Sequence, residues 1–364
     1  MNTLQKKKLR GTGVNCGLVV LLFAVVLLLG QVLPDNTYRR VLVPIIWQMC
    51  IFILLGTSLN LTLGYLGQLT LGHMGFAGIG AYTAALSSLA LERAGVFEAS
   101  KAAPGQLILV VLGCCLLGAI FAGLLGLLVG IPALRLRGDY LAIVTLGFGL
   151  IVENVIANLP FAGGDGLASG TASSSLYANG LGLSTSLQAK YVWLVLGITV
   201  LCIALMCTFI RSKYGRAIEA IRDDEIAAEA MGVNLAKHKS LSFVISSFFA
   251  AIGGALMAMF LGAVSSTTFT IAVTYFILLI VVIGGMGSVT GSVISAFLVI
   301  ASREWWLRFL DKTTYIGDFR VPLLKTGFRM VVFSVILMVV VLFFRTGIMG
   351  DKELTFDGIG GWLK

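Results

Sequence analysis

Polar side chains that could do chemistry stand inside otherwise apolar stretches of this sequence, among them Gln68, His73 and Glu153. An unpaired polar group is costly in hydrocarbon, so each needs a hydrogen-bonding partner or a water-filled cavity. The glycines of residues 64–82 permit a broken helix, whose free backbone groups could meet a zwitterionic solute. The same glycines would also allow close helix packing, with Gln68 and His73 bonded across an interface. Glu153 is expected near the outer end of its span, where it could simply reach water. The candidate path residues are Gln68, Thr70, His73, Phe76, Tyr82, Thr145, Glu153 and Asn154.

Patterns for catalysis or nucleotide binding are missing from the sequence. It has no G-x-x-x-x-G-K-[ST] loop and no Gly-Lys pair at all, so it lacks the usual cradle for ATP phosphates. None of the six cysteines forms a C-x-x-C pair and only two histidines exist, which disfavours a metal or haem site. We expect a non-enzymatic chain without metal or cofactor, which has no ATP-binding site of its own.

Composition places the chain in a membrane. Only 12% of its 364 residues are charged, 58% are hydrophobic and the mean hydropathy is +0.99, whereas soluble domains carry about 25% charged residues. The net charge of +9 comes from residues at the ends of apolar runs, where positive charges set orientation. No nucleic-acid-binding pattern accompanies them, so the expected surroundings are a lipid bilayer and not nucleic acid.

Apolar runs of about 20 residues predict an all-α, polytopic bundle of transmembrane helices. Two glycine-rich regions are less simple: 64–90 is counted as one crossing and 269–302 as two. This gives ten crossings, or eight to ten if helices break at the glycines. The other predicted spans are 17–33, 41–63, 106–131, 139–159, 191–210, 241–263 and 326–344.

Charge placement predicts the topology. The N-terminus, the loop with Arg135 and Arg137, the loop 211–240 and the tail beginning with Arg345 are expected on the cytoplasmic side. No small-residue cleavage site follows the first apolar run, so that run is interpreted as an uncleaved span. The predicted organisation is a cytoplasmic N-terminus (1–16), a membrane domain (17–344) with an outer loop at 160–190, and a cytoplasmic tail (345–364).

The charged loop 211–240 is patterned like one amphipathic helix. Arg222 can pair with Glu219 and with Glu225 at a spacing of three residues. Gly232 supplies a helix stop before the chain re-enters the membrane at Leu241. An ordinary solvated loop helix would explain this pattern, and so would an element that docks into a groove of a soluble partner.

This loop resembles the cytoplasmic coupling loop of ABC importer permeases, and most closely that of the branched-chain amino-acid permeases of LivM type. Their pattern is similar to S-x-x-G-R-A-x-x-A-I-R-D-x-E-x-A-A-x-x-x-G, which matches this sequence from Ser212 to Gly232. The resemblance implies contact with an ATPase subunit. The residues that it implicates in this coupling are Arg216, Glu219, Arg222, Asp223, Glu225, Ala227, Ala228, Glu229 and Gly232.

Three further motifs of that family occur in order along the chain. G-Y-x-G-Q-x-[ST]-L-G-H begins at Gly64, L-R-L-R-G-x-Y-L-A-I-x-T-L-G-F begins at Leu134, and G-G-x-G-S-x-x-G begins at Gly284. The chain departs from the family where Gly149 is followed by Leu150 rather than by Glu. The resemblance implies a LivH-like second permease, two cytoplasmic ATPase subunits and an extracytoplasmic solute-binding protein in a bacterial plasma membrane.

Other functions remain open from the sequence. Related permeases handle urea, short amides or nucleosides, so the substrate class rests on resemblance to the branched-chain amino-acid members. A self-sufficient secondary transporter would need intramembrane charge for ion coupling, and the predicted spans offer little beyond Glu153.

Overall fold

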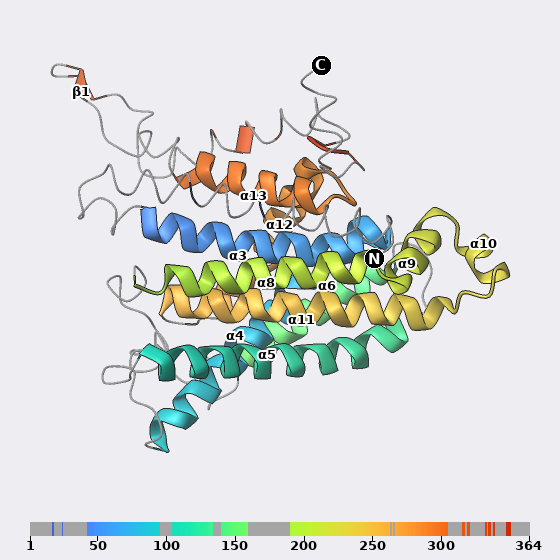
Figure 1. Ribbon diagram of the computed structural model, residues 1–364. Helices are drawn as coiled ribbons and strands as arrows, with labels where there is room; N and C mark the ends of the chain where they lie inside the picture. The colour runs from blue at the N-terminus through green and yellow to red at the C-terminus, as the bar shows by residue number, and fades with distance from the viewer. Residues whose placement is uncertain are drawn as a thin grey trace.

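The computed structural model describes residues 42–94, 104–133, 140–158, 190–262, 264, 266–304 and 347–350, with a few isolated positions elsewhere. This part of the chain is almost wholly helical (Figure 1). Its elements are α3 (Val43–Asn60) continued by the π-helix η2 (Leu61–Tyr65), α4 (His73–Arg93), α5 (Pro104–Ala133), α6 (Tyr140–Asn158), α8 (Val192–Ile210), α9 (Lys213–Asp223), α10 (Glu225–Ala230), α11 (Leu235–Leu261), the 3-10 turn η5 (Ser266–Phe269), α12 (Ile271–Gly284), α13 (Val289–Glu304) and an antiparallel pair, β1 (Tyr315–Ile316) and β2 (Phe319–Arg320).

Six helices of the described part are long and apolar enough to cross a membrane: α3 with η2, α4, α5, α6, α8 and α11. They confirm the predicted spans at 41–63, 106–131, 139–159 and 191–210 and the single crossing within 64–90. The helix that contains the predicted span 241–263 begins earlier, at Leu235. The prediction missed its first turns because they carry lysines, which the hydropathy pattern assigned to the preceding loop. The predicted spans 17–33 and 326–344, the outer loop 160–190 and the N-terminal segment lie outside the described residues, apart from a few isolated positions. Of the C-terminal segment 345–364, the structure describes residues 347–350.

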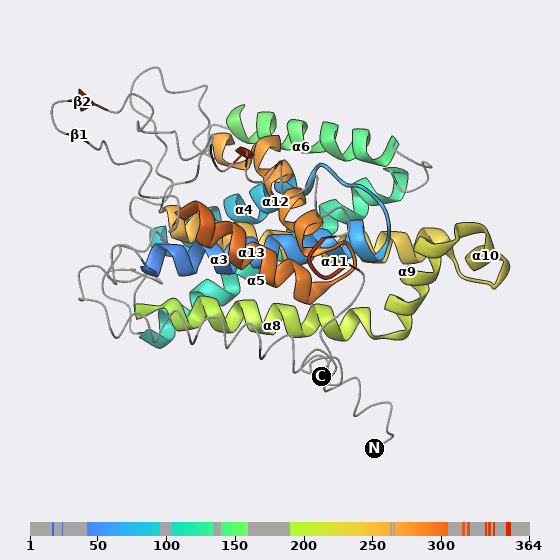
Figure 2. The same ribbon diagram turned by 90° about the horizontal axis from the view of Figure 1, so that it is seen from above.

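The core forms where α11 packs along α3, α4 and α5. Small residues let these backbones approach closely: a Cβ on Gly254 would overlap the Ala77 carbonyl, and one on Gly80 would meet Ala251. Such contacts replace the hydrophobic driving force that is absent between helices in lipid. Seen from above, α6 and α8 lie at opposite edges of the bundle, with α3, α4 and α11 between them (Figure 2).

Residues 271–304 form a helical hairpin instead of the two full crossings predicted from the sequence. α12 has 14 residues and α13 has 16, and the two are bent by 120° at the break between them. At 1.5 Å per residue each covers about 21–24 Å, less than the roughly 30 Å hydrocarbon core. The Ser295 hydroxyl donates to the Ile280 carbonyl oxygen at 2.7 Å, so α13 folds back along α12. The prediction failed because an apolar stretch of this length suits two spans, and the turn depends on tertiary contacts.

The charged segment between α8 and α11 consists of two helices where the sequence suggested one. Asp224 leaves the helical conformation, and its carboxylate accepts hydrogen bonds from Ile226 N and Ala227 N to begin α10. Figure 1 shows α9 and α10 projecting beyond the ends of the long helices. Gly232 ends α10 with φ +84°, as the sequence predicted. The break at Asp224 allows the chain to turn and pack one face of α9 against the bundle.

Candidate functional site

The connection between α3 and α4 lies at the end of the bundle that carries α9 and α10. The helix of α3 loosens into the π-turn at 61–65, and Gly67 then takes φ +74°, which favours glycine. α4 begins at His73 after this break. The glycine-rich segment is therefore a junction between two spans, with the broken backbone placed at one end of the bundle and not midway along a helix.

The side chain of Asn60 forms several hydrogen bonds at this junction. Its side-chain oxygen accepts from Gly287 N at 2.9 Å, and its amide nitrogen donates to Ser288 O and Ser292 Oγ at 2.9 Å each. The residue is fully buried. The turn of the α12–α13 hairpin is therefore held by the side-chain amide of Asn60, at the end of α3. On its other side, Ile348 N and Met349 N donate to the carbonyls of Ile283 and Gly284, which end α12.

Arg222 on α9 reaches the same junction. Its Nη1 donates to the Gly64 carbonyl oxygen at 3.1 Å, and its Nη2 lies 3.2 Å from the Asp223 carboxylate. The predicted pairing of Arg222 with Glu225 is wrong, because the helix breaks between the two residues. Glu225 instead pairs with Lys239 on α11, with 2.6 Å between Oε1 and Nζ.

α10 presents apolar side chains to the surroundings. Ile226 is 81% exposed and Met231 is 84% exposed, whereas Ala228 is buried against the rest of the chain. Of the residues that the resemblance implicates in coupling, some face outward, some are half-buried and some bind the protein itself. Those exposed on α9, α10 and the following turn are Arg216, Arg222, Asp223, Ala227, Glu229 and Gly232, whereas Glu219 and Glu225 are half-buried. Arg222 also reaches Gly64.

The polar residues of the glycine-rich segment are mostly satisfied within the protein. His73 Nε2 lies 2.9 Å from the Ser58 hydroxyl, and Thr70 Oγ1 lies 3.3 Å from Thr62 Oγ1. The Gln68 side-chain oxygen is buried without a hydrogen-bonding partner, although the residue as a whole is half-buried. These contacts fit the packing interpretation for His73 and Thr70, and leave Gln68 as the one with unused hydrogen-bonding capacity.

Three other candidate path residues bridge helices. Phe76 packs its ring on Phe148 and on Phe243, with centroids 4.8 and 5.4 Å away. The Thr145 hydroxyl accepts from Leu71 N at 3.1 Å, which ties α6 to the start of α4. Tyr82 donates a long hydrogen bond of 3.4 Å to the Val264 carbonyl. Their positions are explained by packing between α4 and its neighbours.

Glu153 and Asn154 lie apart from this cluster, near the far end of α6. Asn154 is exposed and its amide donates to the Leu150 carbonyl of its own helix at 2.8 Å. Glu153 is half-buried. The structure therefore does not bring these two residues together with Gln68, Thr70 and His73.

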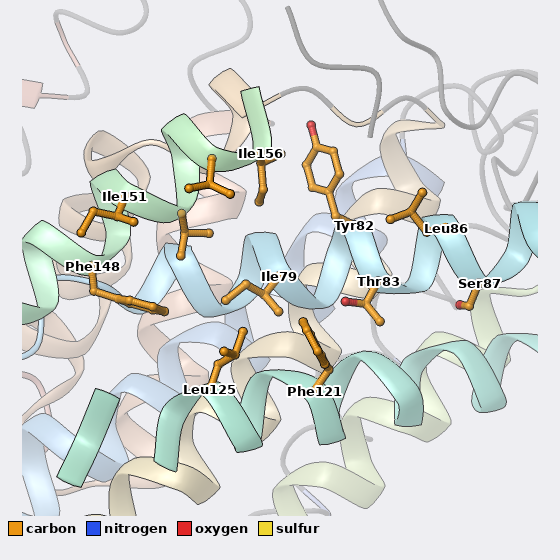
Figure 3. A pocket seen from close by; sticks show the side chains of 12 residues that line it. Ile79, Tyr82, Thr83, Leu86, Ser87, Phe121, Leu125, Phe148, Ile151 and Ile156 are labelled. Atoms are coloured by element: carbon orange, nitrogen blue, oxygen red, sulfur yellow. The ribbon is translucent and has the colours of Figure 1, made fainter. Parts of the chain in front are cut away.

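A groove of about 710 Å³ runs between α4, α5 and α6 (Figure 3). In Figure 3, α4 lies between α6, which carries Ile151 and Ile156, and α5, which carries Leu125 and Phe121. The lining contains no charged side chain, and the Ser87 hydroxyl already donates to the Ala84 carbonyl. The groove can therefore hold an apolar group but offers little to a charged ammonium or carboxylate. Its lining residues are Ile79, Tyr82, Thr83, Leu86, Ser87, Phe121, Leu125, Phe148, Ile151, Val152, Val155 and Ile156.

Sequence reasoning missed Asn60, Lys239, Ile226 and Met231. Asn60 is a lone amide inside an apolar span, the same signal that selected Gln68 and Asn154, and could have been found by it. Lys239 was assigned to a solvated loop, and nothing in its neighbours predicts that it is 4% exposed. Within the described residues, no group of three or more His, Cys, Asp or Glu side chains could hold a metal ion.

The sequence matches the family model described as the branched-chain amino acid transport system permease component over residues 41–344. The chain belongs to this permease family. It is 36% identical over 303 residues to the Escherichia coli high-affinity branched-chain amino acid transport system permease protein LivM, covering 78% of this chain and 68% of that one. Family membership and the six apolar helices make this a multi-pass membrane protein with a transport role.

More distant relatives match shorter parts of this permease. The LivH permease protein of Salmonella typhimurium is 28% identical over 179 residues, 47% of this chain and 49% of that one. The xylose transport system permease protein XylH of Escherichia coli is 33% identical over 126 residues, about a third of each chain. No solved structure matches the chain significantly.

Proposed function

We propose that this chain is the LivM-type permease subunit of an ABC importer. With a second, LivH-like permease it forms the translocation path for branched-chain and other hydrophobic amino acids. Two cytoplasmic ATPase subunits bind ATP and drive transport, and an extracytoplasmic solute-binding protein delivers the substrate. The chain itself binds no cofactor. Similarity to LivM along most of the sequence supports the substrate class.

The observation that carries this proposal is the outward-facing apolar surface of α10. Ile226 and Met231 stand at the tip of an element that is tied to the bundle by the Arg222–Gly64 and Lys239–Glu225 contacts. Large apolar side chains on a charged, projecting segment mark an interaction surface. A short helix anchored in this way fits a groove of a soluble partner, and we assign that partner as the ATPase.

The proposed orientation places α9 and α10 in the cytoplasm. The loops around them carry the positive charges, and the N-terminal Lys6, Lys7 and Lys8 are placed on the same side by the positive-inside rule. Both termini are then cytoplasmic in a bacterial inner membrane.

Reconstitution tests the transport role directly. The chain is placed in proteoliposomes alone, and together with the second permease, the ATPases and the binding protein, and uptake of labelled leucine is measured with and without ATP. We expect ATP-dependent uptake by the complete set only. ATP-independent uptake by the chain alone would show a self-sufficient transporter instead.

Competition in the same assay identifies the substrate class. We expect unlabelled isoleucine and valine to suppress leucine uptake, whereas urea, nucleosides and xylose leave it unchanged. The apolar lining of the groove between α4, α5 and α6 is compatible with aliphatic side chains. If urea or a nucleoside competed more strongly than isoleucine and valine, the substrate class would be that of another group of permeases in the family.

The α10 surface is tested with Ile226→Asp combined with Met231→Asp. Burying two carboxylates in an apolar docking groove is unfavourable, so we expect co-purification of the ATPases to fall at least about tenfold, equivalent to about 1.4 kcal/mol. Ala236→Asp is the matched control, since this residue is exposed in the first turn of α11, where a negative charge is tolerated. Unchanged ATPase recovery with the double variant would remove α10 as the docking element.

A further inference from the structure

The end of α3 touches both the projecting helix α9 and the turn of the α12–α13 hairpin. Gly64 accepts a hydrogen bond from Arg222, and four residues earlier Asn60 holds Gly287, Ser288 and Ser292. Residues four apart in a helix lie on one face, so the two contacts are stacked along the same side of α3. A chain of direct contacts therefore runs from α9 to the hairpin.

Arg222 binds a carbonyl that the helix leaves free. The last four carbonyl groups of a helix have no partner within it, and Gly64 is in the final turn of the π-helix. A cation is also favoured there by the helix dipole. The Asp223 carboxylate steadies the guanidinium group at 3.2–3.3 Å. The stem of Arg222 packs on Gly67, where a Cβ would come within 2.9 Å of its Cγ.

Gly64 transmits this contact because nothing separates it from the hairpin. A Cβ at this position would overlap both Asn60 Oδ1 and Gly287 N. The backbone of η2 thus lies directly against the turn, whose own shape depends on Gly285 and Gly287 at φ +109° and +93°. Close packing of this kind passes a displacement on instead of absorbing it.

Asn60 holds the hairpin in register with α3. It uses both amide protons and its oxygen on three different groups of the turn and of the first turn of α13. An amide has few hydrogen-bonding sites and all its partners here are buried, so the turn cannot shift without losing several bonds at once. Such a contact has discrete made and broken states, as a switching element requires.

We propose that Arg222 and Asn60 act as positioning residues of one relay, through which movement of α9 is carried by Gly64 to the turn of the α12–α13 hairpin. The relay rests on the proposed function, because it takes its input from an ATPase docked on α10. It assigns Arg222 to contact within the chain, while the ATPase is contacted by Ile226 and Met231. The hairpin is then the membrane element that responds to ATP.

The test uses the full complex in proteoliposomes, with leucine uptake and ATP hydrolysis measured on the same preparation. Arg222→Ala and Asn60→Ala are expected to retain ATPase co-purification and hydrolysis while uptake per ATP hydrolysed falls at least about fivefold, the lower end of allosteric couplings. The double variant is expected to be no worse than the single ones, because both residues serve one pathway. Arg222→Lys, which can still donate to the Gly64 carbonyl, is expected to restore part of the coupling.

The controls are Lys213→Ala, which removes an exposed cation from α9, and Asn158→Ala, which removes an amide that donates to its own helix. Both should keep the parental ratio of uptake to hydrolysis. If Asn60→Ala lowers assembly, Asn60→Ser replaces it under the same criteria. Normal uptake per ATP in either single variant, or additive losses in the double variant, would overturn the relay. Failure of the unmodified complex to show ATP-driven uptake would instead refute the proposed function.

Discussion

At the scale of single residues, the ion pair between Glu225 and Lys239 shows how α10 is attached. The Lys239 side chain is 5% exposed, whereas that of Glu225 is 43% exposed. The two partners therefore depend on the pair unequally. Removing the carboxylate leaves a buried ammonium group unpaired, while removing the lysine leaves a carboxylate that water can reach.

We expect Glu225→Ala to destabilise the protein more than Lys239→Met. The stranded charge costs more than the about 1–3 kcal/mol of an unsatisfied neutral group, whereas methionine fills the lysine site with an unbranched apolar side chain. Thermal unfolding in detergent, followed by loss of the monodisperse peak, compares the two variants. Glu229→Ala, which changes an exposed carboxylate on the same helix, should leave the midpoint close to that of the parent. Equal losses in the two pair variants would contradict this asymmetry.

At the scale of elements, glycines set the distance between α4 and α6. A Cβ on Gly72 would overlap the Thr145 carbonyl oxygen, and Gly149 lies against Gly72 from the other helix. Gly147 is also on α6, yet a Cβ there would meet nothing within 4 Å. Gly72 is thus in close backbone contact with α6, whereas Gly147 has open space around it.

Gly72→Ala is expected to lower stability by about 1–3 kcal/mol through forced separation of the helices. Gly147→Ala is expected to be neutral or stabilising by up to about 1 kcal/mol, because alanine favours the helix more than glycine does. Gly72 has φ −89°, a value open to alanine, so any loss comes from the contact and not from backbone strain. Thermal unfolding of both variants gives the answer; a Gly72→Ala protein as stable as the parent would mean that the two helices are not in close contact.

At the scale of the whole molecule, the bundle has two unlike ends. α9 and α10 extend beyond one end, where the relay residues also lie, and the link between α11 and α12 lies at the other. In the orientation that we propose, the positive charges of the sequence place the end with α9 and α10 in the cytoplasm.

Single cysteines report this orientation. Ile226→Cys is expected to react with a membrane-impermeant maleimide only after cells are opened, and Leu261→Cys, at the outer end of α11, is expected to react on intact cells. The native Cys50, Cys114, Cys115, Cys202 and Cys207 are all buried, so background labelling should be low; Cys16 is replaced by serine beforehand. Labelling of Ile226→Cys on intact cells would reverse the proposed topology.

The sequence predicted the membrane spans well because hydropathy over about 20 residues is a direct physical requirement of the bilayer. It also predicted the helix stop at Gly232. The prediction failed where the outcome depends on tertiary or capping contacts. The turn of the hairpin at 271–304 is held by hydrogen bonds from Asn60. The break between α9 and α10 occurs where the Asp224 side chain caps the following helix. The predicted pairing of Arg222 with Glu225 followed from helical spacing and was lost with the helix break.

The sequence predicted where polar residues are buried at the candidate site, but not which groups they bind. Selecting polar residues in apolar runs located the α3–α4 junction, since His73 and Thr70 are indeed buried there. Whether such a residue is satisfied by packing depends on partners such as Ser58 and Thr62, which only the fold supplies. All the candidate path roles stay predictions: those of Gln68, Thr70, His73, Phe76, Tyr82, Thr145, Glu153 and Asn154.

The helical hairpin at 271–304 also has a consequence for how the protein is made. Its turn is held by Asn60, 227 and 228 positions away from its partners Gly287 and Ser288, and by Ile348 and Met349, which leave the ribosome well after the turn itself. The carbonyls that end α12 therefore lack these donors until the chain has grown by a further 65 residues. The hairpin can acquire its full set of hydrogen bonds only after Met349 has been synthesised, so part of its structure forms after its own residues have left the ribosome.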